Sequence, residues 1–247
     1  MGNNRSQYLA RQKAFWNVTD EKIATYQRIY ADGTGSEIRC RTHTQQSLAH
    51  ILEGIHPQSD WTLLEIGCGN GRLMLELSRL FQFQRLIGID ISESMISFAR
   101  KNLAYDPRVE LFVNSGCDLA MVQDDFVDFA YANDVFIHLF DYDIIVGYFR
   151  EVHRVLKRNG VFRFNINRFD PDTAFGNSLG GRFAKFMYRC GLRSAGRHRW
   201  EPRQGTGFHG NQFMIREIRH ALKQGFFPVA EIHPEDIYLW CTVRKIQ

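Results

Sequence analysis

The feature that most constrains the fold is the alternation of short apolar runs and amphipathic segments between residues 60 and 167. Each apolar run has the length and composition of a buried strand, and each amphipathic segment has helical spacing. Parallel strands need crossover connections, usually helices, so this alternation predicts an α/β fold with a Rossmann-like doubly wound sheet and helices on both faces. Strands are expected at 61–67, 85–92, 109–116, 125–133 and 160–167, with helices at 72–81, 92–103 and 141–160 between them.

The remaining segments complete a single domain, a common size for an α/β chain of 247 residues. The last two apolar runs, PVAEIH and IYLWCTVRKI, are joined by PED with no helix between them, which predicts a C-terminal antiparallel hairpin. We therefore expect a mostly parallel sheet with one antiparallel edge. The expected segments are a helical cap (1–57), the sheet core (60–167), an insert that is a candidate lid (168–210), and a final helix and hairpin (211–247).

A glycine-rich turn follows the first expected strand, in the stretch LLEIGCGNGRL. Gly67, Gly69 and Gly71 alternate with other residues, and an acid, Asp90, ends the second expected strand. Ligands of doubly wound sheets bind beyond the carboxyl ends of the strands, and an acid about twenty residues after such a turn can accept hydrogen bonds from a ribose. The third glycine is one residue closer than in the dinucleotide fingerprint, which disfavours a nicotinamide enzyme.

The ordered set of motifs resembles the class I S-adenosylmethionine (SAM) dependent methyltransferases. Glu-x-Gly-x-Gly-x-Gly is followed by Gly-x-Asp, then by ISESMISFAR, SGCD and FREVHRVLKRNGVFRF, as in that family. The resemblance covers residues 60–167 and the final hairpin, and it implies that SAM is the cofactor.

The resemblance also implies roles for individual residues around SAM. The turn would carry the amino acid moiety, Glu65 its ammonium and Asp90 the ribose, while Met95 would pack near the adenine and Asp118 would accept from the adenine amino group. Two simpler interpretations stay open: Asp118 as a helix N-cap and Cys68 as a small buried filler. The implied cofactor-binding residues are Glu65, Gly67, Cys68, Gly69, Asn70, Gly71, Asp90, Ile91, Met95, Cys117, Asp118 and Asn133.

Candidates for the methyl acceptor lie after the fourth and fifth strands. His138 is either a general base or a structural histidine, and its apolar surroundings favour the structural role. Asn165, Asn167 and Arg168 could orient the acceptor. The basic, aromatic stretch 181–203 could close over an anionic group, line a nucleic-acid groove or form a solvated face. Its candidate arginines are Arg182, Arg189, Arg193, Arg197 and Arg199.

These patterns predict an enzyme that methylates an oxygen or nitrogen of a small metabolite, which we expect to be anionic. The alternatives are an RNA or protein methyltransferase, or a non-catalytic SAM-binding protein; no Asn/Asp-Pro-Pro-Tyr/Phe motif of base-amine methylation is present. Five cysteines without a Cys-x-x-Cys pair predict no metal site and a reducing, cytoplasmic location. No apolar run reaches the roughly 18 residues of a membrane span, so no membrane association is expected.

Overall fold

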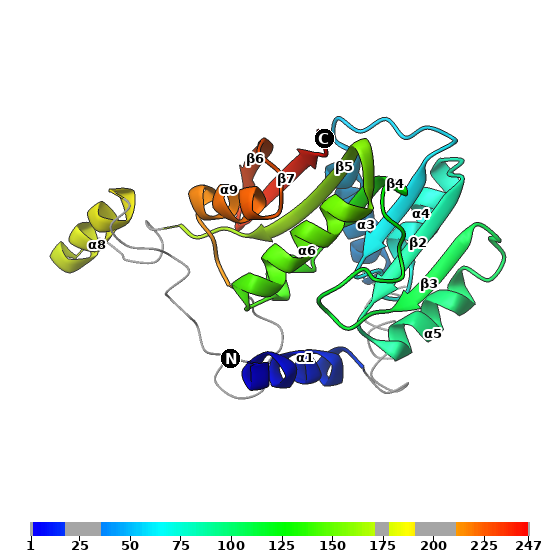
Figure 1. Cartoon of the computed structure of the whole chain (residues 1–247), viewed down its shortest axis with the longest axis horizontal. Helices are drawn as coiled ribbons and strands as arrows, with labels where there is room; N and C mark the ends of the chain where they lie inside the picture. Colours follow the sequence, from blue (N-terminus) through cyan, green and yellow to red (C-terminus); the bar gives the residue numbers. More distant parts are fainter. Residues whose placement is uncertain (1, 18–35, 171–177, 191–210, 247) are drawn as a thin grey trace.

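A seven-stranded sheet forms the centre of the molecule, in the order β3-β2-β1-β4-β5-β7-β6 (Figure 1). The computed structural model describes residues 2–17, 36–170, 178–190 and 211–246. Chain order reverses between β1 and β4, which places the topological switch point beside β1. The strands are β1 (Thr62–Ile66), β2 (Arg85–Asp90), β3 (Val109–Val113), β4 (Val127–Ala132), β5 (Leu156–Asn167), β6 (Ala230–Glu235) and β7 (Tyr238–Arg244).

The strands pair as the sequence predicts, parallel from β3 to β5 and antiparallel at β7 and β6. The hairpin turn differs from the expected PED. Pro234 and Glu235 belong to β6, and the turn is Asp236 and Ile237, with Asp236 at φ 47°. Proline is tolerated there because β6 is an edge strand, where a missing N–H need not break a ladder.

The helix expected to stop at Gly160 ends earlier. This helix, α6 (Tyr142–Val155), gives way to β5 at Leu156, which already pairs with Val127 of β4. The register then shifts so that Phe129 pairs with Val161, and the intervening residues form an irregularity in which Asn159 has φ 66°. A Cβ at Gly160 would lie 2.8 Å from the Lys157 carbonyl oxygen, so glycine serves this bulge rather than a helix end.

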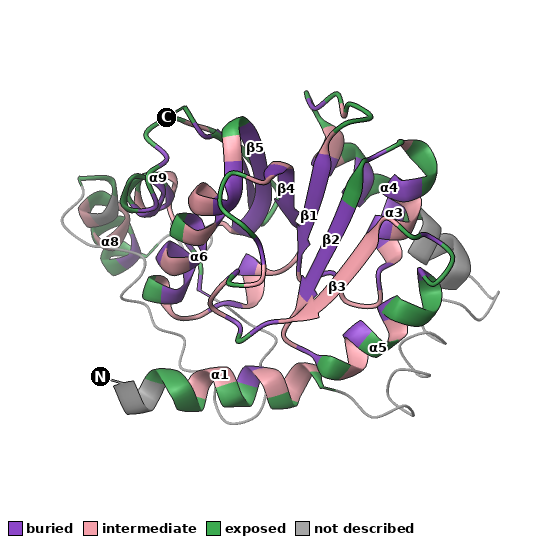
Figure 2. Cartoon of the chain, turned by 45° about the vertical axis from the view of Figure 1, so that its right-hand side comes forward, coloured by how far each residue is buried: buried purple, intermediate pink, exposed green. Residues whose placement is uncertain are grey.

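Helices cover both faces of the sheet, and each face has its own apolar core. One core joins α3 (Ser36–Leu52), α4 (Arg72–Leu80) and α5 (Glu93–Asn102) to residues such as Leu63 and Phe129. The other joins α6 and α9 (Ile215–Gln224) to alternate strand residues such as Leu64 and Ile66. The strands in the middle of the sheet are buried throughout, as Figure 2 shows, which explains their continuous apolar runs.

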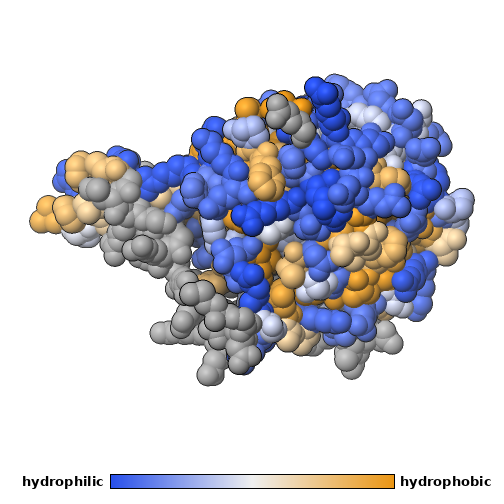
Figure 3. All heavy atoms as spheres, in the orientation of Figure 1, coloured by the Kyte–Doolittle hydropathy of each residue, from blue (hydrophilic) through white to orange (hydrophobic). Residues whose placement is uncertain are grey.

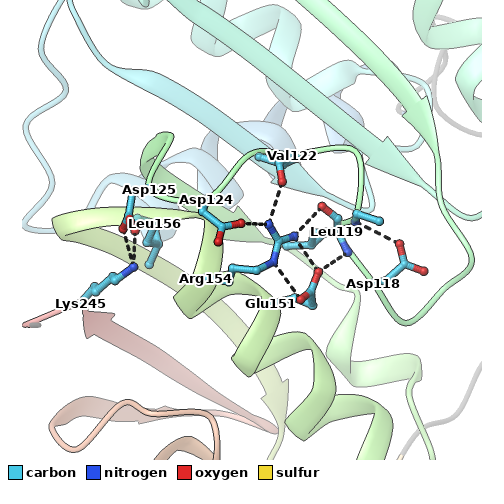
Figure 4. Close-up of polar contacts among 10 residues, drawn as sticks. Asp118, Leu119, Val122, Asp124, Asp125, Glu151, Arg154, Leu156 and Lys245 are labelled. Carbon is cyan, nitrogen blue, oxygen red and sulfur yellow. Dashed lines mark hydrogen bonds and ion pairs between the residues drawn. The ribbon is translucent and has the colours of Figure 1, made fainter.

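A network of ion pairs fixes the loop between β3 and β4 (Figure 4). The Arg154 guanidinium on α6 donates to both oxygens of Glu151, to the Leu119 and Val122 carbonyls, and to Asp124. Glu151 in turn accepts the Leu119 N–H at 3.0 Å. Because one guanidinium holds several points of the loop, the segment that borders the carboxyl end of β3 has a fixed path.

Two helices lie outside these layers. α1 (Gly2–Trp16) runs across the end of the sheet at which the strand arrows point (Figure 2). α8 (Leu179–Arg189) stands away from the body (Figure 1) and exposes an apolar face of Leu179, Phe183 and Phe186, seen as an orange tip in Figure 3. None of the helices in the described ranges is both long and apolar enough to cross a membrane.

Candidate functional site

The glycine turn after β1 has a backbone that only glycine adopts easily. Gly67, Gly69 and Gly71 have φ of 73°, 53° and 80°, in the left-handed region. A Cβ at Gly67 would lie 2.2 Å from Val135 Cγ2, whereas nothing lies within 4 Å of a Cβ built at Gly69. The first glycine thus permits a close approach of β1 to the chain after β4, and the second leaves open space beside the turn.

Asp90 joins this turn to the end of β2. Its Oδ2 accepts the Gly69 N–H and its Oδ1 accepts the Ser92 N–H, both at 2.8 Å. Burial raises the pKa of the Asp90 carboxyl, and the backbone N–H groups that it accepts oppose that rise. Ser92 also caps α5, as the sequence predicts, by accepting the Met95 N–H. A carboxylate is therefore fixed at the mouth of the turn with lone pairs left for a ligand.

A pocket opens at the carboxyl ends of β1, β2 and β4, next to the switch point. Ligands of open α/β sheets bind in this position. Its walls come from the glycine turn and β2 on one side, the chain after β4 on the other, the loop after β3, and α1. Apart from α1, the lining residues are Ile66, Gly67, Gly69, Ile89, Asp90, Ile91, Met95, Asn114, Gly116, Asp134, Val135, His138, Leu139 and Tyr148.

The wall after β4 is built around Asp134. This residue has φ 58°, in the left-handed region, which aspartate adopts more readily than most non-glycine residues. Asn165 on β5 holds it twice: the Asp134 N–H donates to Asn165 Oδ1 at 2.8 Å, and Asn165 Nδ2 donates to Asp134 Oδ1 at 2.7 Å. Asn133 Nδ2 donates to Asp134 Oδ2 at 3.0 Å. The carboxylate is thereby fixed against the pocket.

Helix α1 forms the outer wall, contributing Leu9, Gln12 and Trp16 to the lining. Trp16 packs against His138 with ring centroids 4.9 Å apart. The Tyr8 hydroxyl accepts the Phe140 N–H at 2.9 Å. At the other side of the pocket, Lys13 donates to Glu93 at 2.8 Å. The helix is thus attached to both rims of the pocket.

Glu65 lies behind the glycine turn rather than in the pocket lining. It is 3% exposed, and its Oε2 has no hydrogen-bond partner. Burial raises the pKa of this carboxyl to about 8, opposed by the neighbouring Tyr131 hydroxyl and by Arg72. Tyr131 is its register partner on β4, and the Tyr131 oxygen also lacks a hydrogen bond of normal geometry.

The structure brings together only some of the residues named from the sequence. Those in the pocket lining are Gly67, Gly69, Asp90, Ile91, Met95 and His138. Those near it but outside the lining are Glu65, Cys68, Asn70, Gly71, Cys117, Asp118 and Asn133. Asp118 is not followed by a helix: its Oδ1 accepts the Ala120 N–H within a turn. The alternative of an N-cap role is therefore excluded, and the adenine role stays a prediction.

The acceptor candidates are more dispersed. Asn165 is buried and bound to Asp134, and Asn167 Nδ2 donates to the Ile137 carbonyl at 2.7 Å. Arg168 forms an isolated bridge with Phe213. Arg182 and Arg189 lie on α8, outside the lining. Arg193, Arg197 and Arg199 fall outside the described residues.

Sequence reasoning missed Asp134, Asn114 and the lining residues of α1. Asp134 follows β4 in ANDVFIHL, where an acid at a strand end was the available signal. Asn114 follows β3 and donates to the Tyr148 hydroxyl at 2.9 Å. Among the parts of the chain that the structure describes, no group of three or more His, Cys, Asp or Glu side chains is arranged to hold a metal ion.

Comparison with known proteins agrees with this geometry. Residues 63–160 match the model of a methyltransferase domain family. A malonyl-[acyl-carrier protein] O-methyltransferase of Geobacter sulfurreducens is 27% identical over 188 residues, which are 75% of this chain and 61% of that protein. The match thus spans only about three fifths of that relative's length.

Two solved structures share the fold. The geranyl diphosphate C-methyltransferase of Streptomyces coelicolor, in complex with Mg²⁺, geranyl diphosphate and S-adenosylhomocysteine, superposes with a TM-score of 0.64 at 15% identity, covering 96% of this chain and 97% of that one. A Haemonchus contortus phosphoethanolamine N-methyltransferase gives 0.60 at 15% identity, covering 82% and 53%. These identities show the fold alone. Together with the methyltransferase domain match, they indicate that residues 63–160 form a methyltransferase domain similar to those of the class I SAM-dependent enzymes.

Proposed function

We propose that this protein transfers a methyl group from SAM to an oxygen or nitrogen of a small metabolite. The observation that carries the proposal is the Asp90 carboxylate, fixed by Gly69 and Ser92 beside an open pocket at the switch point of the sheet. An acid in this position suits the two hydroxyls of a ribose, and the open space beside Gly69 suits a ligand that lies on the turn. The residues present therefore fit SAM.

The roles of the other residues follow from the same fit. Ile91 and Met95 would contact the adenine, together with Asn114 and Gly116, which line the pocket after β3. The buried, unpartnered oxygen of Glu65 would face the cofactor ammonium, directly or through water. Gly67, Cys68, Asn70 and Gly71 would shape the turn. As the resemblance implies, Asp118 and the backbone at Cys117 would lie beside the adenine amino group, and Asn133 would line the methionine part of SAM.

SAM supplies a methyl group on a positively charged sulfur, so the protein mainly has to hold the acceptor close and aligned. Helix α1 is attached to both rims by Tyr8 and Lys13, and we propose that it closes over the cofactor. Exclusion of water strengthens electrostatic interactions in the pocket. His138 contributes to this wall through its packing with Trp16.

The insert is our candidate for contacts outside the pocket. We propose that some of its arginines bind an anionic group of the acceptor, since a guanidinium donates a planar fork to carboxylate or phosphate. The relatives act on different acceptors according to their names, so those names do not select one. The candidate contacts are Asn167, Arg168, Arg182, Arg189, Arg193, Arg197 and Arg199.

Calorimetry with SAM, S-adenosylhomocysteine (SAH) and NAD tests the cofactor half of the proposal. We expect SAM and SAH to bind and NAD not to bind. Incubation with SAM that carries a radiolabelled methyl group and a fractionated metabolite pool then tests transfer. NAD binding without SAM binding would end the proposal. Binding without transfer to any pool would favour the non-catalytic alternative. Transfer of the label only to RNA or protein would favour the alternative of an RNA or protein methyltransferase.

A further inference from the structure

The two ends of the pocket carry the same sign of charge. Asp90 lies at the β2 end and Asp134 at the β4 end. Among the described residues that line the pocket, none is lysine or arginine. A carboxylate or phosphate at the β4 end would therefore meet a fixed negative charge with no cation among these lining residues to offset it.

The Asp134 carboxylate has capacity for a further donor. Asn165 and Asn133 each donate one hydrogen bond to it, and a carboxylate can accept about four. Its side chain keeps 34% of its surface exposed. The two asparagine amides orient the carboxylate without neutralising its charge. Asn165 is itself held in place because it lies on β5 and is only 1% exposed. Asp134 is therefore a preorganised anionic acceptor of hydrogen bonds.

The groups around Asp134 come from several elements. His43 Nε2 on α3 lies 3.9 Å from Asp134 Oδ2. Tyr238 on β7 lies near enough for the Asp134 charge to add to the burial that raises the pKa of its hydroxyl. An imidazole, a phenol and two amides thus surround the carboxylate. All four can donate hydrogen bonds, and the imidazole alone can carry positive charge.

We propose that Asp134, positioned by Asn165, receives an amine nitrogen of the methyl acceptor, which makes the protein an N-methyltransferase. This inference rests on the proposed function and names the acceptor atom that the proposed function leaves open. It places no anionic group of the acceptor at the β4 end of the pocket and leaves any such group to contacts outside the pocket.

The chemistry of N-methylation suits a carboxylate in this position. The amine lone pair forms a bond to the methyl carbon as the carbon–sulfur bond breaks, and its electron pair stays on sulfur. An acceptor that binds as an ammonium first loses one proton to solvent, which frees this lone pair, and the positive charge then passes from sulfur to nitrogen as the methyl group is transferred. Asp134 accepts the N–H and stabilises the charge that develops on nitrogen. Afterwards the methylated ammonium loses its proton to solvent.

The first experiment measures binding without turnover. Ligand-observed NMR on the SAH-saturated protein compares n-butylamine with butyrate, which have the same chain and opposite charge. We expect saturation transfer to butylamine and little to butyrate. Asp134→Asn should weaken the amine signal about 10- to 100-fold in affinity, the range for a lost hydrogen bond to a charged group. An equal butyrate signal, or no amine signal from the wild-type protein, would overturn the inference.

Asp236→Asn is the matched control for that variant. Asp236 is also an aspartate with positive φ, at 47°, but it is exposed in the hairpin turn. Asparagine tolerates this backbone conformation as aspartate does, so both variants should fold. We expect Asp236→Asn to keep the wild-type amine signal, and both variants to keep the wild-type affinity for SAH.

The second experiment identifies the acceptor atom. The metabolite pool is treated with an acetylating ester that blocks primary and secondary amines, or mock-treated, and then offered with radiolabelled SAM. We expect acetylation to abolish labelling. Labelling that survives acetylation would refute the amine while leaving methyl transfer intact. If the wild-type protein does not bind SAH, or if it labels none of the mock-treated pools, the result would instead count against the proposed function and with it the inference.

Discussion

The two ends of the pocket are built in different ways. At the β2 end, the Asp90 carboxylate accepts the backbone N–H groups of Gly69 and Ser92 within a span of 24 residues, and the motif that contains all three is visible in the sequence. At the β4 end, Asp134 depends on Asn165, 31 residues away on the next strand. The β2 end, which a local motif builds, suits a cofactor that many related enzymes have in common. The residues of the β4 end can differ from one enzyme to another with the acceptor, because no single local motif determines them.

The largest predicted effect concerns Gly67, where the two ends touch. In Gly67→Ala the new Cβ would lie 2.2 Å from Val135 Cγ2, at a φ of 73°. We expect a loss of about 3 kcal/mol or more in the free energy of unfolding, from overpacking and backbone strain together. Urea denaturation measures it.

Gly69→Ala separates these two causes. Its φ is 53°, but nothing lies within 4 Å of the added Cβ. The free energy of unfolding of this variant should fall by only about 1–2 kcal/mol, the cost of holding alanine in the left-handed conformation. If both variants lose the same free energy of unfolding, glycine is required at position 67 for its backbone conformation and not for the close contact with the chain after β4.

The second prediction concerns Glu65, which the motif identifies but which is buried outside the pocket lining. Its folded pKa of about 8 lies above its usual 4.5, so the folded protein keeps a proton that the unfolded chain releases. Stability should therefore fall as pH rises through this window, by at most about 1.4 kcal/mol per pH unit. Glu65→Gln should remove this slope in denaturation series from pH 5 to pH 9, and the exposed Glu231→Gln should keep it.

Glu65 also reports on the cofactor. If the ammonium of SAH reaches the buried carboxyl, it favours the ionised form, and binding at pH 7 releases a proton. Calorimetry in two buffers of different ionisation enthalpy would detect that proton in the wild-type protein and lose it in Glu65→Gln. Identical enthalpies in both buffers would place the ammonium elsewhere and make Glu65 a structural residue of the core.

The third prediction separates the two acids. Asp90→Asn should weaken SAH binding by about 1–3 kcal/mol, because an amide cannot replace a carboxylate that accepts from two backbone N–H groups and a ribose. Asp134→Asn should leave SAH affinity within about twofold, because we propose that Asp134 binds the acceptor amine and makes no hydrogen bond to the cofactor; a lost hydrogen bond to the cofactor would cost about 0.5–1.5 kcal/mol or more. Calorimetry on both variants tests this. Equal losses would mean that both ends bind the cofactor.

What the sequence predicts well is local. The order and type of the strands followed from apolar runs, and the Ser92 cap followed from its place before a helical pattern. Gly160 was misassigned because a glycine after a basic helical turn is typical of a helix end, whereas pairing of Leu156 with Val127 ends α6 first. Asp134 was missed because the contacts that fix it are mostly tertiary: Asn165 on β5 binds both its N–H and its carboxylate, and a single sequence does not show such contacts.

The smallest predicted effect concerns His138, the histidine at the β4 end. It lines the pocket, its carbonyl lies 3.5 Å from the Tyr8 hydroxyl, and its ring packs on Trp16. If amine methylation needs no general base, His138→Ala should lower kcat less than about tenfold, whereas loss of a base would cost roughly 10²–10⁴-fold. Its main effect should be on packing of α1, with a stability loss of about 1 kcal/mol. The exposed His56→Ala is the control. A hundredfold loss of kcat with unchanged thermal stability would make His138 the base and would favour a hydroxyl acceptor over an amine.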